Sequence, residues 1–297
     1  MAAPGELGID GFDYRTIEVG PTRYVPGIAG QGPPVLLLHG FPETHYCWHR
    51  VAPGLAEDHT VVVCDLKGYG ESVSEPGGEL GDGYSNRERG GELVELMRGL
   101  GHERFSVVGH DRGGRVGYRM ALDHPDEVER LGVLNVIPTV EQFDRMDADT
   151  ALGYWPFIFL AQPPPFAERV IGASAEYVVR SILESWPASP DAISAEAIEL
   201  YVRAFTAETI PGICAEYRAS FHIDRAMDAE DRQAGSRIAC PVLVHWGSEE
   251  GQMSDSLEIW RRWADSVEGS PLPSGHFIPE EAPEELLASL RRFLAAN

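Results

Sequence analysis

The sequence predicts an α/β fold in which helices cover both faces of a mainly parallel sheet. The first observation is that short apolar runs alternate with segments of helical periodicity, as in strands joined by crossover helices. The second is that residues 139–234 interrupt this alternation with helical patterns rich in aromatic side chains. We therefore expect a core of residues 1–138 and 235–297, with a helical cap, 139–234, inserted over the carboxyl edge of the sheet.

The individual elements follow from local patterns in chain order. Residues 11–30 are typical of an antiparallel lead-in hairpin. The apolar runs of the core predict strands at 35–38, 60–66, 105–111, 130–138 and 241–247. Apolar side chains at helical spacing predict a helix over 86–100: Leu93, Leu96, Met97 and Leu100. Further helices are expected after residue 42, from Gly113 through Leu122, around 257–264, and from about Pro283 onward.

Composition excludes several classes of partner. The chain has 297 residues, of which 43% are hydrophobic and 24% charged, as in a soluble globular protein. Its formal net charge of −23 disfavours nucleic acid and anionic membranes, because like charges repel. We see neither an apolar run of roughly 18 residues, which a membrane span needs, nor a signal peptide. The 4 cysteines lack metal or redox spacing, so we expect reduced thiols, a cytoplasmic location, no metal and no cofactor.

A candidate nucleophile lies in the stretch SVVGHDRGGRVGY, residues 106–118. A strand ends near Gly109 and a helix begins near Gly113, so the sharp turn between them displays the side chain of Asp111. A carboxylate has an ordinary pKa near 3.9, so it is ionised at pH 7 and needs no base to attack carbon. Such an attack displaces a leaving group and forms an ester on the aspartate.

Two further motifs supply the rest of a hydrolytic site. In HGFP (39–42), the backbone N–H of Phe41 could face that of Arg112 and form an oxyanion hole. In SGHFIPEE (274–281), His276 lies in a loop before the last helix, where it could act as general base on water. The spacing of the three motifs along an α/β pattern favours an enzyme that hydrolyses a covalent ester.

These motifs resemble those of the α/β-hydrolases that use an aspartate nucleophile, which include haloalkane dehalogenases, epoxide hydrolases and haloacetate dehalogenases. The chain is most similar to the fluoroacetate (haloacetate) dehalogenases. The similar segments cover nearly the whole chain: HGFPETHYCWHR, DLKGYGES, GHDRGGRVGYRMALDHP, LAQPPPF, ESW, EYRA and SGHFIPEEAP. The resemblance implies an α/β-hydrolase fold, a small-molecule substrate and a homodimer, although no motif of the sequence indicates the dimer.

The resemblance also implies that the substrate is a carboxylate. In fluoroacetate dehalogenases the two arginines of D-R-G-G-R bind the substrate carboxylate, and the matching residues are Arg112 and Arg115. They are three residues apart at the first turn of a helix, hence neighbours on one face. An arginine fork matches a carboxylate with two parallel hydrogen bonds, and a helix N-terminus attracts anions.

The acid partner of the histidine departs from the family pattern. The family carries it at the end of the strand before the cap, where this sequence has V-L-N-V-I-P and places Asn135. An asparagine can orient an imidazole, but it cannot stabilise an imidazolium by charge. After the next core strand, H-W-G-S-E-E-G places Glu250 where many other α/β-hydrolases carry their acid. We favour Glu250 as the partner of His276, with Asn135 as a neutral substitute.

The leaving-group side departs as well. The family's cap holds the departing halide with a His-Trp pair and a tyrosine, but the His-Trp positions are here Pro156 and Phe157. Neither side chain can donate a hydrogen bond, which makes defluorination doubtful, whereas chloride or bromide would need fewer hydrogen-bond donors to leave. The remaining candidates from the resemblance or from neighbouring positions are Tyr217 (in E-Y-R-A), Trp186 (in E-S-W), Tyr154 and Trp155.

The first hypothesis is therefore a cofactor-independent hydrolase that displaces halide from a small 2-haloacid. The second is an epoxide hydrolase acting on a polar or acidic epoxide by the same ester mechanism, with Tyr217 and Tyr154 as proton donors. The third is a non-catalytic homologue that binds a small carboxylate, which Asn135, Pro156 and Phe157 support.

Overall fold

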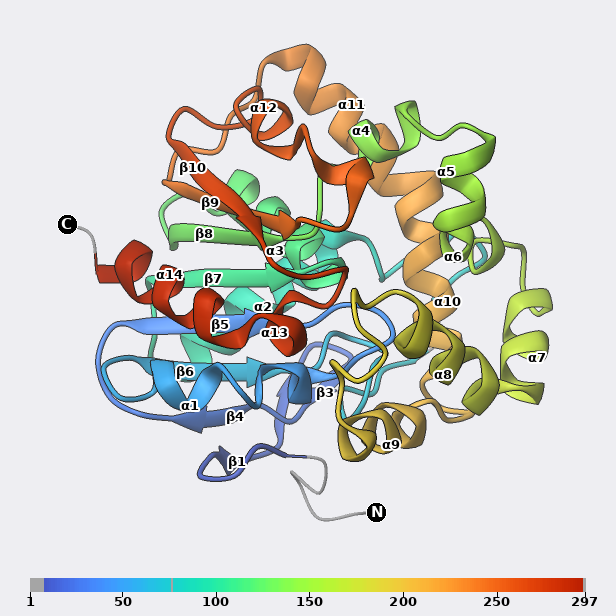
Figure 1. The fold of residues 1–297 in the computed structure, drawn as a ribbon, viewed down its shortest axis with the longest axis horizontal. Coiled ribbons are helices and arrows are strands. Elements are labelled where there is room, and N and C mark those ends of the chain that lie inside the picture. The colour runs from blue at the N-terminus through green and yellow to red at the C-terminus, as the bar shows by residue number, and fades with distance from the viewer. Residues whose placement is uncertain (1–7, 76, 296–297) are drawn as a thin grey trace.

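In the computed structural model, which describes residues 8–75 and 77–295, the main sheet has the strand order β1-β4-β6-β5-β7-β8-β9-β10 (Figure 1). Strands β5 to β10 run parallel, and β1 and β4 join one edge antiparallel. The prediction of a mainly parallel sheet is therefore confirmed. The strands of this sheet are β1 (Asp13–Tyr14), β4 (Gly27–Ala29), β5 (Pro34–Leu38), β6 (Thr60–Cys64), β7 (Phe105–His110), β8 (Val128–Leu134), β9 (Val242–Gly247) and β10 (Val267–Leu272).

The central strands are buried along almost their whole length. Every residue of β7 and β9 is buried, and only the first residue of β5 and of β6 is not. Their sequences are rich in Val and Leu, as expected for strands that are covered on both faces, because neither face is exposed to water. In Figure 1, helices α1 (Ala52–Leu55) and α14 (Pro283–Ala295) lie in front of the sheet, and α2 (Asn86–Gly99) and α3 (Arg112–Asp123) lie behind it.

Two expected elements differ in detail, and one strand was not expected. The lead-in hairpin of residues 11–30 is two antiparallel pairs: β1 pairs with β4, and β2 (Ile17–Val19) pairs with β3 (Thr22–Tyr24) in a small separate sheet. Strand β8 ends at Leu134 and not at residue 138, because Asn135 has a φ of 51°, which no strand residue adopts. Strand β10 was not predicted, since its sequence VEGSPL contains a glycine and a proline, which are rare in strands.

A block of helices occupies the chain between β8 and β9, and we call it the helical segment. It lies beside the carboxyl ends of the parallel strands (Figure 1). Its elements are α4 (Thr139–Asp144), α5 (Ala148–Gly153), α6 (Trp155–Phe159), α7 (Phe166–Ala173), α8 (Ala175–Ser185), α9 (Ala195–Ala204), α10 (Ile210–Ala219), the π-helix η2 (Ser220–Asp224) and α11 (Arg225–Ala234). Because the carboxyl edge of such a sheet carries the loops of the site, this segment is placed to contribute side chains to it.

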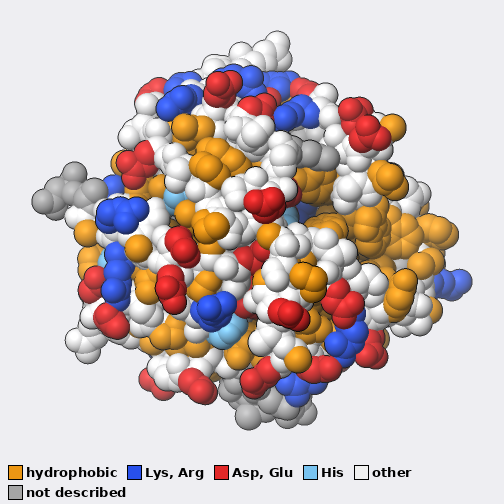
Figure 2. Space-filling model, viewed as in Figure 1, with side chains coloured by type: hydrophobic (Ala, Val, Ile, Leu, Met, Phe, Trp, Pro, Cys, Tyr) orange, Lys and Arg blue, Asp and Glu red, His pale blue; other side chains and the backbone are white. Residues whose placement is uncertain are grey.

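The surface of the helical segment is more apolar than that of the core in the view of Figure 2, where orange side chains gather over α5 to α8 at the right. The exposed large apolar residues there are Leu152, Ile158, Phe166, Val170 and Tyr177. Across the described ranges, no helix combines the length and apolar character needed to cross a lipid bilayer. All four cysteines are free thiols.

Candidate active site

Asp111 lies at the turn between β7 and α3. Its backbone has φ 45° and ψ −109°, a conformation that residues other than glycine rarely adopt. Glycines make this turn possible. A Cβ on Gly109 would lie 2.3 Å from the backbone of Gly113, and one on Gly113 would lie 2.4 Å from the carbonyl oxygen of Leu38. Local steric requirements therefore fix the elbow and hold the Asp111 carboxylate at the end of the strand.

The two oxygens of the Asp111 carboxylate have different surroundings. Oδ1 accepts a hydrogen bond of 3.1 Å from the backbone N–H of Phe41, in the loop that follows β5. No donor of residues 8–75 or 77–295 forms a hydrogen bond with Oδ2. Burial would raise the pKa of Asp111, but the positive charges of His276, Arg112, His110 and Arg115 outweigh it and hold the pKa below its ordinary value. The Asp111 carboxylate is therefore ionised, with one oxygen left free.

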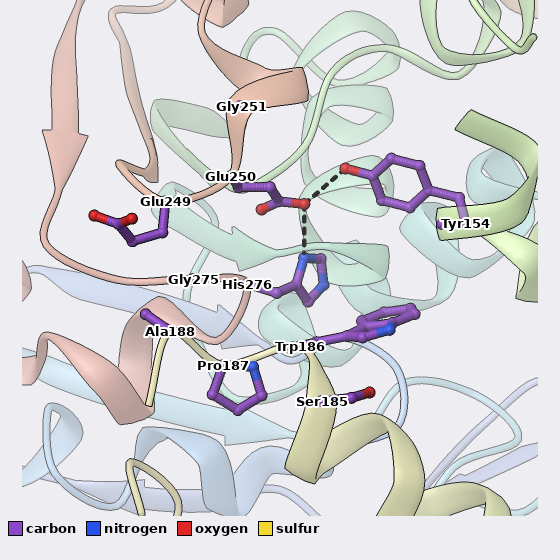
Figure 3. Close-up of a pocket in the computed structure, with 11 residues that line it drawn as sticks. Tyr154, Ser185, Trp186, Pro187, Ala188, Glu249, Glu250, Gly251, Gly275 and His276 are labelled. Atoms are coloured by element: carbon purple, nitrogen blue, oxygen red, sulfur yellow. Dashed lines mark hydrogen bonds and ion pairs between the residues drawn. The ribbon is translucent and has the colours of Figure 1, made fainter. Parts of the chain in front are cut away.

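His276 follows β10 and faces Glu250, which follows β9 (Figure 3). Its Nδ1 lies 3.4 Å from Glu250 Oε1. Its other ring nitrogen, Nε2, is buried and has no hydrogen-bond partner among the described residues. Burial would lower the pKa of His276, but the carboxylates of Glu250 and Asp111 outweigh it and raise the pKa to about 9. The free Nε2 is the atom of this ring that can exchange a proton with water.

Asn135 contacts the backbone of the histidine loop and not the imidazole. Its side-chain nitrogen donates to the carbonyl oxygens of Gly275 (3.1 Å) and His276 (2.7 Å), and its side-chain oxygen accepts from the N–H of Gly247. Asn135 thus ties the end of β8 to the end of β9 and to the loop that carries His276. The two candidate partners of His276 therefore have different places: Glu250 faces the ring, and Asn135 holds the loop.

Arg112 is fully buried behind the nucleophile's turn and is paired with an acid from the helical segment. Its Nε lies 2.9 Å from Glu216 Oε1, and one terminal nitrogen donates to Ser220 Oγ at 3.1 Å. Glu216 also pairs with Arg89 and accepts a hydrogen bond of 2.6 Å from Tyr69. Two guanidiniums therefore share one carboxylate, which leaves the cluster with a surplus positive charge.

Arg115 is buried without a carboxylate within ion-pair distance among the described residues. Its Nη1 donates to the carbonyl oxygen of Ile137 (3.1 Å) and to Thr139 Oγ1 (3.2 Å). Burial and the neighbouring charge of Arg112 lower its pKa. A buried guanidinium with only neutral partners is the group most ready to receive an anion.

Two aromatic rings of the helical segment cover these arginines. The guanidinium carbon of Arg112 lies 4.3 Å from the ring centre of Tyr217, and that of Arg115 lies 5.0 Å from the ring centre of Phe157. Tyr217 also meets the ring of Phe41 edge to face. The Tyr217 hydroxyl forms no hydrogen bond with any described residue, so it remains a donor for a bound group.

The other expected leaving-group residues have separate places. Trp186 lies edge-on to His276, with ring centres 5.1 Å apart. Tyr154 donates a hydrogen bond of 2.6 Å to Glu250 Oε1, the same oxygen that His276 approaches (Figure 3). Trp155 packs against Phe159, and it is not among the residues that line the pocket beside His276. The structure thus brings Trp186 and Tyr154 to the imidazole side and Tyr217 to the arginine side.

A pocket of about 410 Å³ opens beside His276 and is bounded by both parts of the chain (Figure 3). Asp111 and the two arginines do not line it, and Asp111 is only 8% exposed. The pocket therefore leads to His276, and Asp111 lies outside its lining. Its lining residues are Gly153, Tyr154, Ser185, Trp186, Pro187, Ala188, Glu249, Glu250, Gly251, Gly275 and His276.

The comparison with known families fits this geometry. A sequence profile of the alpha/beta hydrolase fold matches residues 33–283. The chain belongs to this family. It is 42% identical over 291 residues to a fluoroacetate dehalogenase of Burkholderia sp., covering 96% of this chain and 95% of that protein. It is 32% identical to a soluble epoxide hydrolase of Corynebacterium sp. (strain C12), covering 90% and 92% of the two chains.

A solved structure of a similar protein has the same fold. An α/β-hydrolase-fold protein from Nostoc sp. PCC 7120 superposes with a TM-score of 0.93 at 42% identity, covering 96% of this chain and 99% of the other. The protein is a hydrolase, and it is related to fluoroacetate dehalogenases and epoxide hydrolases.

Sequence reasoning missed two buried partners in this hydrolase. Glu216 lies beside Tyr217 in the motif E-Y-R-A, but nothing in the sequence indicates that it pairs with Arg112. His110 Nε2 lies 2.8 Å from the carbonyl oxygen of His276, and Nδ1 lies 3.1 Å from Glu43. Because a carbonyl can only accept, Nε2 of His110 must carry a proton, and this hydrogen bond fixes the histidine loop from a second side.

The described residues hold no group of three or more His, Cys, Asp or Glu side chains that could bind a metal ion. The groups that meet at the site are an ionised carboxylate, a histidine with its glutamate, a backbone N–H donor and two buried guanidiniums.

Proposed function

We propose that this hydrolase displaces halide from a small 2-haloacid, with Asp111 as the nucleophile and His276 as the general base. The observation that carries the proposal is the Asp111 carboxylate, which accepts the Phe41 N–H through Oδ1 and leaves Oδ2 ionised and free. The 42% identity to a fluoroacetate dehalogenase supports the same class of reaction. We also propose that residues 139–234 act as the cap of the site, since they contribute Tyr154, Trp186 and Tyr217.

The first step is an attack on carbon. Asp111 Oδ2 forms a bond to the carbon that carries the halogen, and the electrons of the carbon–halogen bond leave with the halide. The product is an ester in which Oδ1 is the carbonyl oxygen, already in reach of the Phe41 N–H. Ester formation removes the negative charge of Asp111, so one of the three carboxylates that raise the pKa of His276 is lost.

The second step hydrolyses the ester. Nε2 of His276 takes a proton from water, and the resulting hydroxide attacks the carbonyl carbon of the ester. Negative charge develops on Oδ1, where the Phe41 N–H stabilises it. The intermediate then collapses, and the hydroxy acid leaves as an alkoxide that takes the proton back from His276. Asp111 is left as a carboxylic acid, because the hydroxyl of the attacking water stays on its carbon, and it returns to a carboxylate by releasing that proton to solvent.

The arginines decide the substrate class. Glu216 is shared by Arg112 and Arg89, and Arg115 forms hydrogen bonds only with neutral oxygens, so the surplus positive charge favours a substrate with a carboxylate. Asp111 and Asp228 act on Arg115 without an ion pair, whereas a substrate carboxylate would bind its guanidinium directly. The Tyr217 hydroxyl, which has no hydrogen bond with the described residues, is free to donate to the leaving group.

An epoxide on an acidic molecule is the second candidate, and Tyr217 favours it. Epoxide opening needs a proton donor for the oxygen that leaves carbon, and a free buried phenol suits that role. The 32% identity to a soluble epoxide hydrolase supports it. Tyr154 is a weaker candidate as a second donor, since its hydroxyl is hydrogen-bonded to Glu250.

The experiment that tests the proposal is a search for the ester. In His276→Asn, Asp111 can still attack, but water is not activated, so we expect an adduct on Asp111 to form and persist. Intact-protein mass spectrometry after exposure to chloroacetate or bromoacetate should show a carboxymethyl addition, and peptide mapping should place it on Asp111. The double variant Asp111→Asn/His276→Asn should stay unmodified.

The outcomes separate the two candidates. An adduct from haloacetates supports the dehalogenase, and an adduct from epoxides alone moves the function to epoxide opening. If neither class modifies the His276→Asn variant while wild type turns one of them over, covalent catalysis by Asp111 is wrong.

A second prediction concerns Arg115. In Arg115→Gln we expect KM for a haloacid to rise about tenfold to a hundredfold, because a hydrogen bond between charged groups is lost. The matched control is the corresponding 2-haloacetamide, whose KM should change little because it carries no charge. An equal rise for acid and amide would show that Arg115 shapes the pocket and does not bind the carboxylate.

A further inference from the structure

Tyr154 and His276 use the same oxygen of Glu250 (Figure 3). The phenol oxygen of Tyr154 lies 2.6 Å from Oε1, a short hydrogen bond, whereas Nδ1 of His276 lies 3.4 Å from it. The second carboxylate oxygen, Oε2, is buried and has no partner among the described residues. The tyrosine therefore has the stronger hold on the acid, and the imidazole has the weaker one.

Glu250 does not depend on Tyr154 for its position in the chain. Its N–H donates to the carbonyl oxygen of Gly247 at 3.1 Å, and its carbonyl oxygen accepts from the N–H of Met253 at 3.0 Å. The side chain consequently stays near His276 when the Tyr154 hydroxyl is removed. What the hydroxyl changes is how much of the carboxylate charge is available to the imidazole.

We propose that Tyr154 is a positioning residue that weakens the hold of Glu250 on the His276 imidazolium, and so keeps His276 available as a base. The inference rests on the proposed function, in which His276 must be neutral to take a proton from water. It assigns Tyr154 a role on the acid side of the site and leaves Tyr217 as the donor for the leaving group.

The charges around His276 explain why such a residue is useful. Three carboxylates raise the proton affinity of this imidazole: Glu250, Asp111 across the site, and Glu43 below it. His110, whose ring centre lies 5.2 Å away, is the other titratable neighbour. With so many negative charges around it, the ring holds its proton at neutral pH, and a protonated ring cannot activate water.

Ester formation makes Glu250 decisive. Once Asp111 is an ester it no longer carries a charge, so Glu250, with the more distant Glu43, sets the proton affinity of His276 during hydrolysis. Tyr154 is then the neighbour that draws charge from the Glu250 carboxylate. The charge of His276 and the hydrogen bond from Tyr154 both lower the pKa of this carboxyl group. Tyr154 also faces Asp111 and Arg115, whose opposite charges act on its own phenol.

Tyr154 lies between α5 and α6, at the C-terminal end of α5 (Ala148–Gly153), so this control of the base comes from the helical segment. The core supplies Asp111, Glu250 and His276, yet the strength of the base depends on a side chain from another part of the fold. The packing of the helical segment on the core therefore affects the proton affinity of His276.

The test is Tyr154→Phe, which removes one hydroxyl and keeps the ring. NMR titration of His276, labelled at its Cε1 carbon, needs no substrate and therefore does not depend on the proposed reaction. We expect the midpoint of His276 to rise by roughly one pH unit, about the effect of one hydrogen bond to a charged group. An unchanged or lower midpoint would overturn the inference.

Tyr201→Phe is the matched control. Tyr201 is also a buried tyrosine of the helical segment whose hydroxyl donates to a carboxyl group of the core, Glu280, and no hydrogen bond or ion pair joins the side chains of Glu280 and His276 within the described ranges. This variant should leave the His276 midpoint unchanged. A second control is Tyr154→Phe in the Glu250→Gln background, where the shift should vanish because the competition needs the carboxylate.

The pH profile supplies a readout that a merely structural role would not move. Ester decay in Tyr154→Phe should be slower than in wild type, up to about tenfold, at pH values below the His276 midpoint, and should reach the wild-type rate at high pH. A loss that is equal at all pH values would show a packing role. If wild type forms no ester with any substrate, the proposed function fails while the NMR titration still decides the role of Tyr154.

Discussion

Asp111→Asn is expected to lower kcat by about 10⁴-fold or more, with little change in the temperature of unfolding. The amide is isosteric with the carboxylate and can still accept the Phe41 N–H through its oxygen, so the elbow keeps its geometry. It carries no negative charge, however, and it cannot form the ester. Loss of a nucleophile in other hydrolases costs on the order of 10⁶ in turnover.

The measurement is halide release and hydroxy acid formation under steady-state conditions. Asp123→Asn is a matched control, because Asp123 is the last residue of the helix that Asp111 precedes, about 18 Å along its axis. It pairs with Arg87 and Arg119, so its replacement affects stability and leaves turnover intact. Turnover by Asp111→Asn within tenfold of wild type would refute the nucleophile.

Glu250→Gln has the second largest expected effect, a fall in kcat on the order of 10³-fold. In a serine protease the corresponding change of aspartate to asparagine costs about 10⁴. A smaller loss is expected here because the Glu250–His276 contact is 3.4 Å long and part of the carboxylate is held by Tyr154. Ester hydrolysis, which turns the neutral imidazole into an imidazolium, should slow more than ester formation, so the ester should accumulate.

The pH profile of this variant should move in a defined direction. The pKa of His276 is raised to about 9 partly by the Glu250 charge, so removing that charge lowers the pKa toward its ordinary value. The residual activity should therefore persist to lower pH than in wild type, although its maximum is much lower. The imidazolium that forms in the transition state has lost its counter-charge, which is why the rate falls although the neutral ring is more abundant.

Glu249→Gln is the control for this prediction. Glu249 is the preceding residue and also lines the pocket, but its side chain points away from His276 (Figure 3). It should keep wild-type turnover and pH dependence. Equal losses in the two variants would mean that charge in the pocket, and not the partner of His276, is what matters.

The elbow is the part of the site that the sequence predicts best, because its constraints are local. Gly109 and Gly113 lie within two residues of Asp111, and Gly109 is required by the approach of the Gly113 backbone within the same turn, whereas Gly113 is required by the approach of the Leu38 backbone from β5. The positions of the central strands were also predictable, since an apolar run such as TVVVC is typical of a strand that is covered on both faces. Strand β10 was not predictable, because an edge strand needs few apolar residues.

The surroundings of His276 show where local patterns end. Asn135 occupies the family's acid position, but its left-handed backbone (φ 51°) ends β8 and turns its amide onto the loop backbone. The same amide satisfies the Gly247 N–H, so three segments meet on one side chain. No pattern in V-L-N-V-I-P indicates such a contact, since its partners come from elsewhere in the chain.

The sequence by itself determined the positions of the central strands and the sharp turn at Asp111, because each depends on neighbours a few residues away. The tertiary structure alone decided that Glu250 faces the imidazole from 26 positions away, and that Tyr154 reaches Glu250 across 96 positions. It also decided that Glu216 is shared by Arg112 and Arg89, and that Arg115 forms its hydrogen bonds with neutral oxygens. Such pairs form when buried charges must find partners as the helical segment packs on the core, and packing is a property of the whole chain.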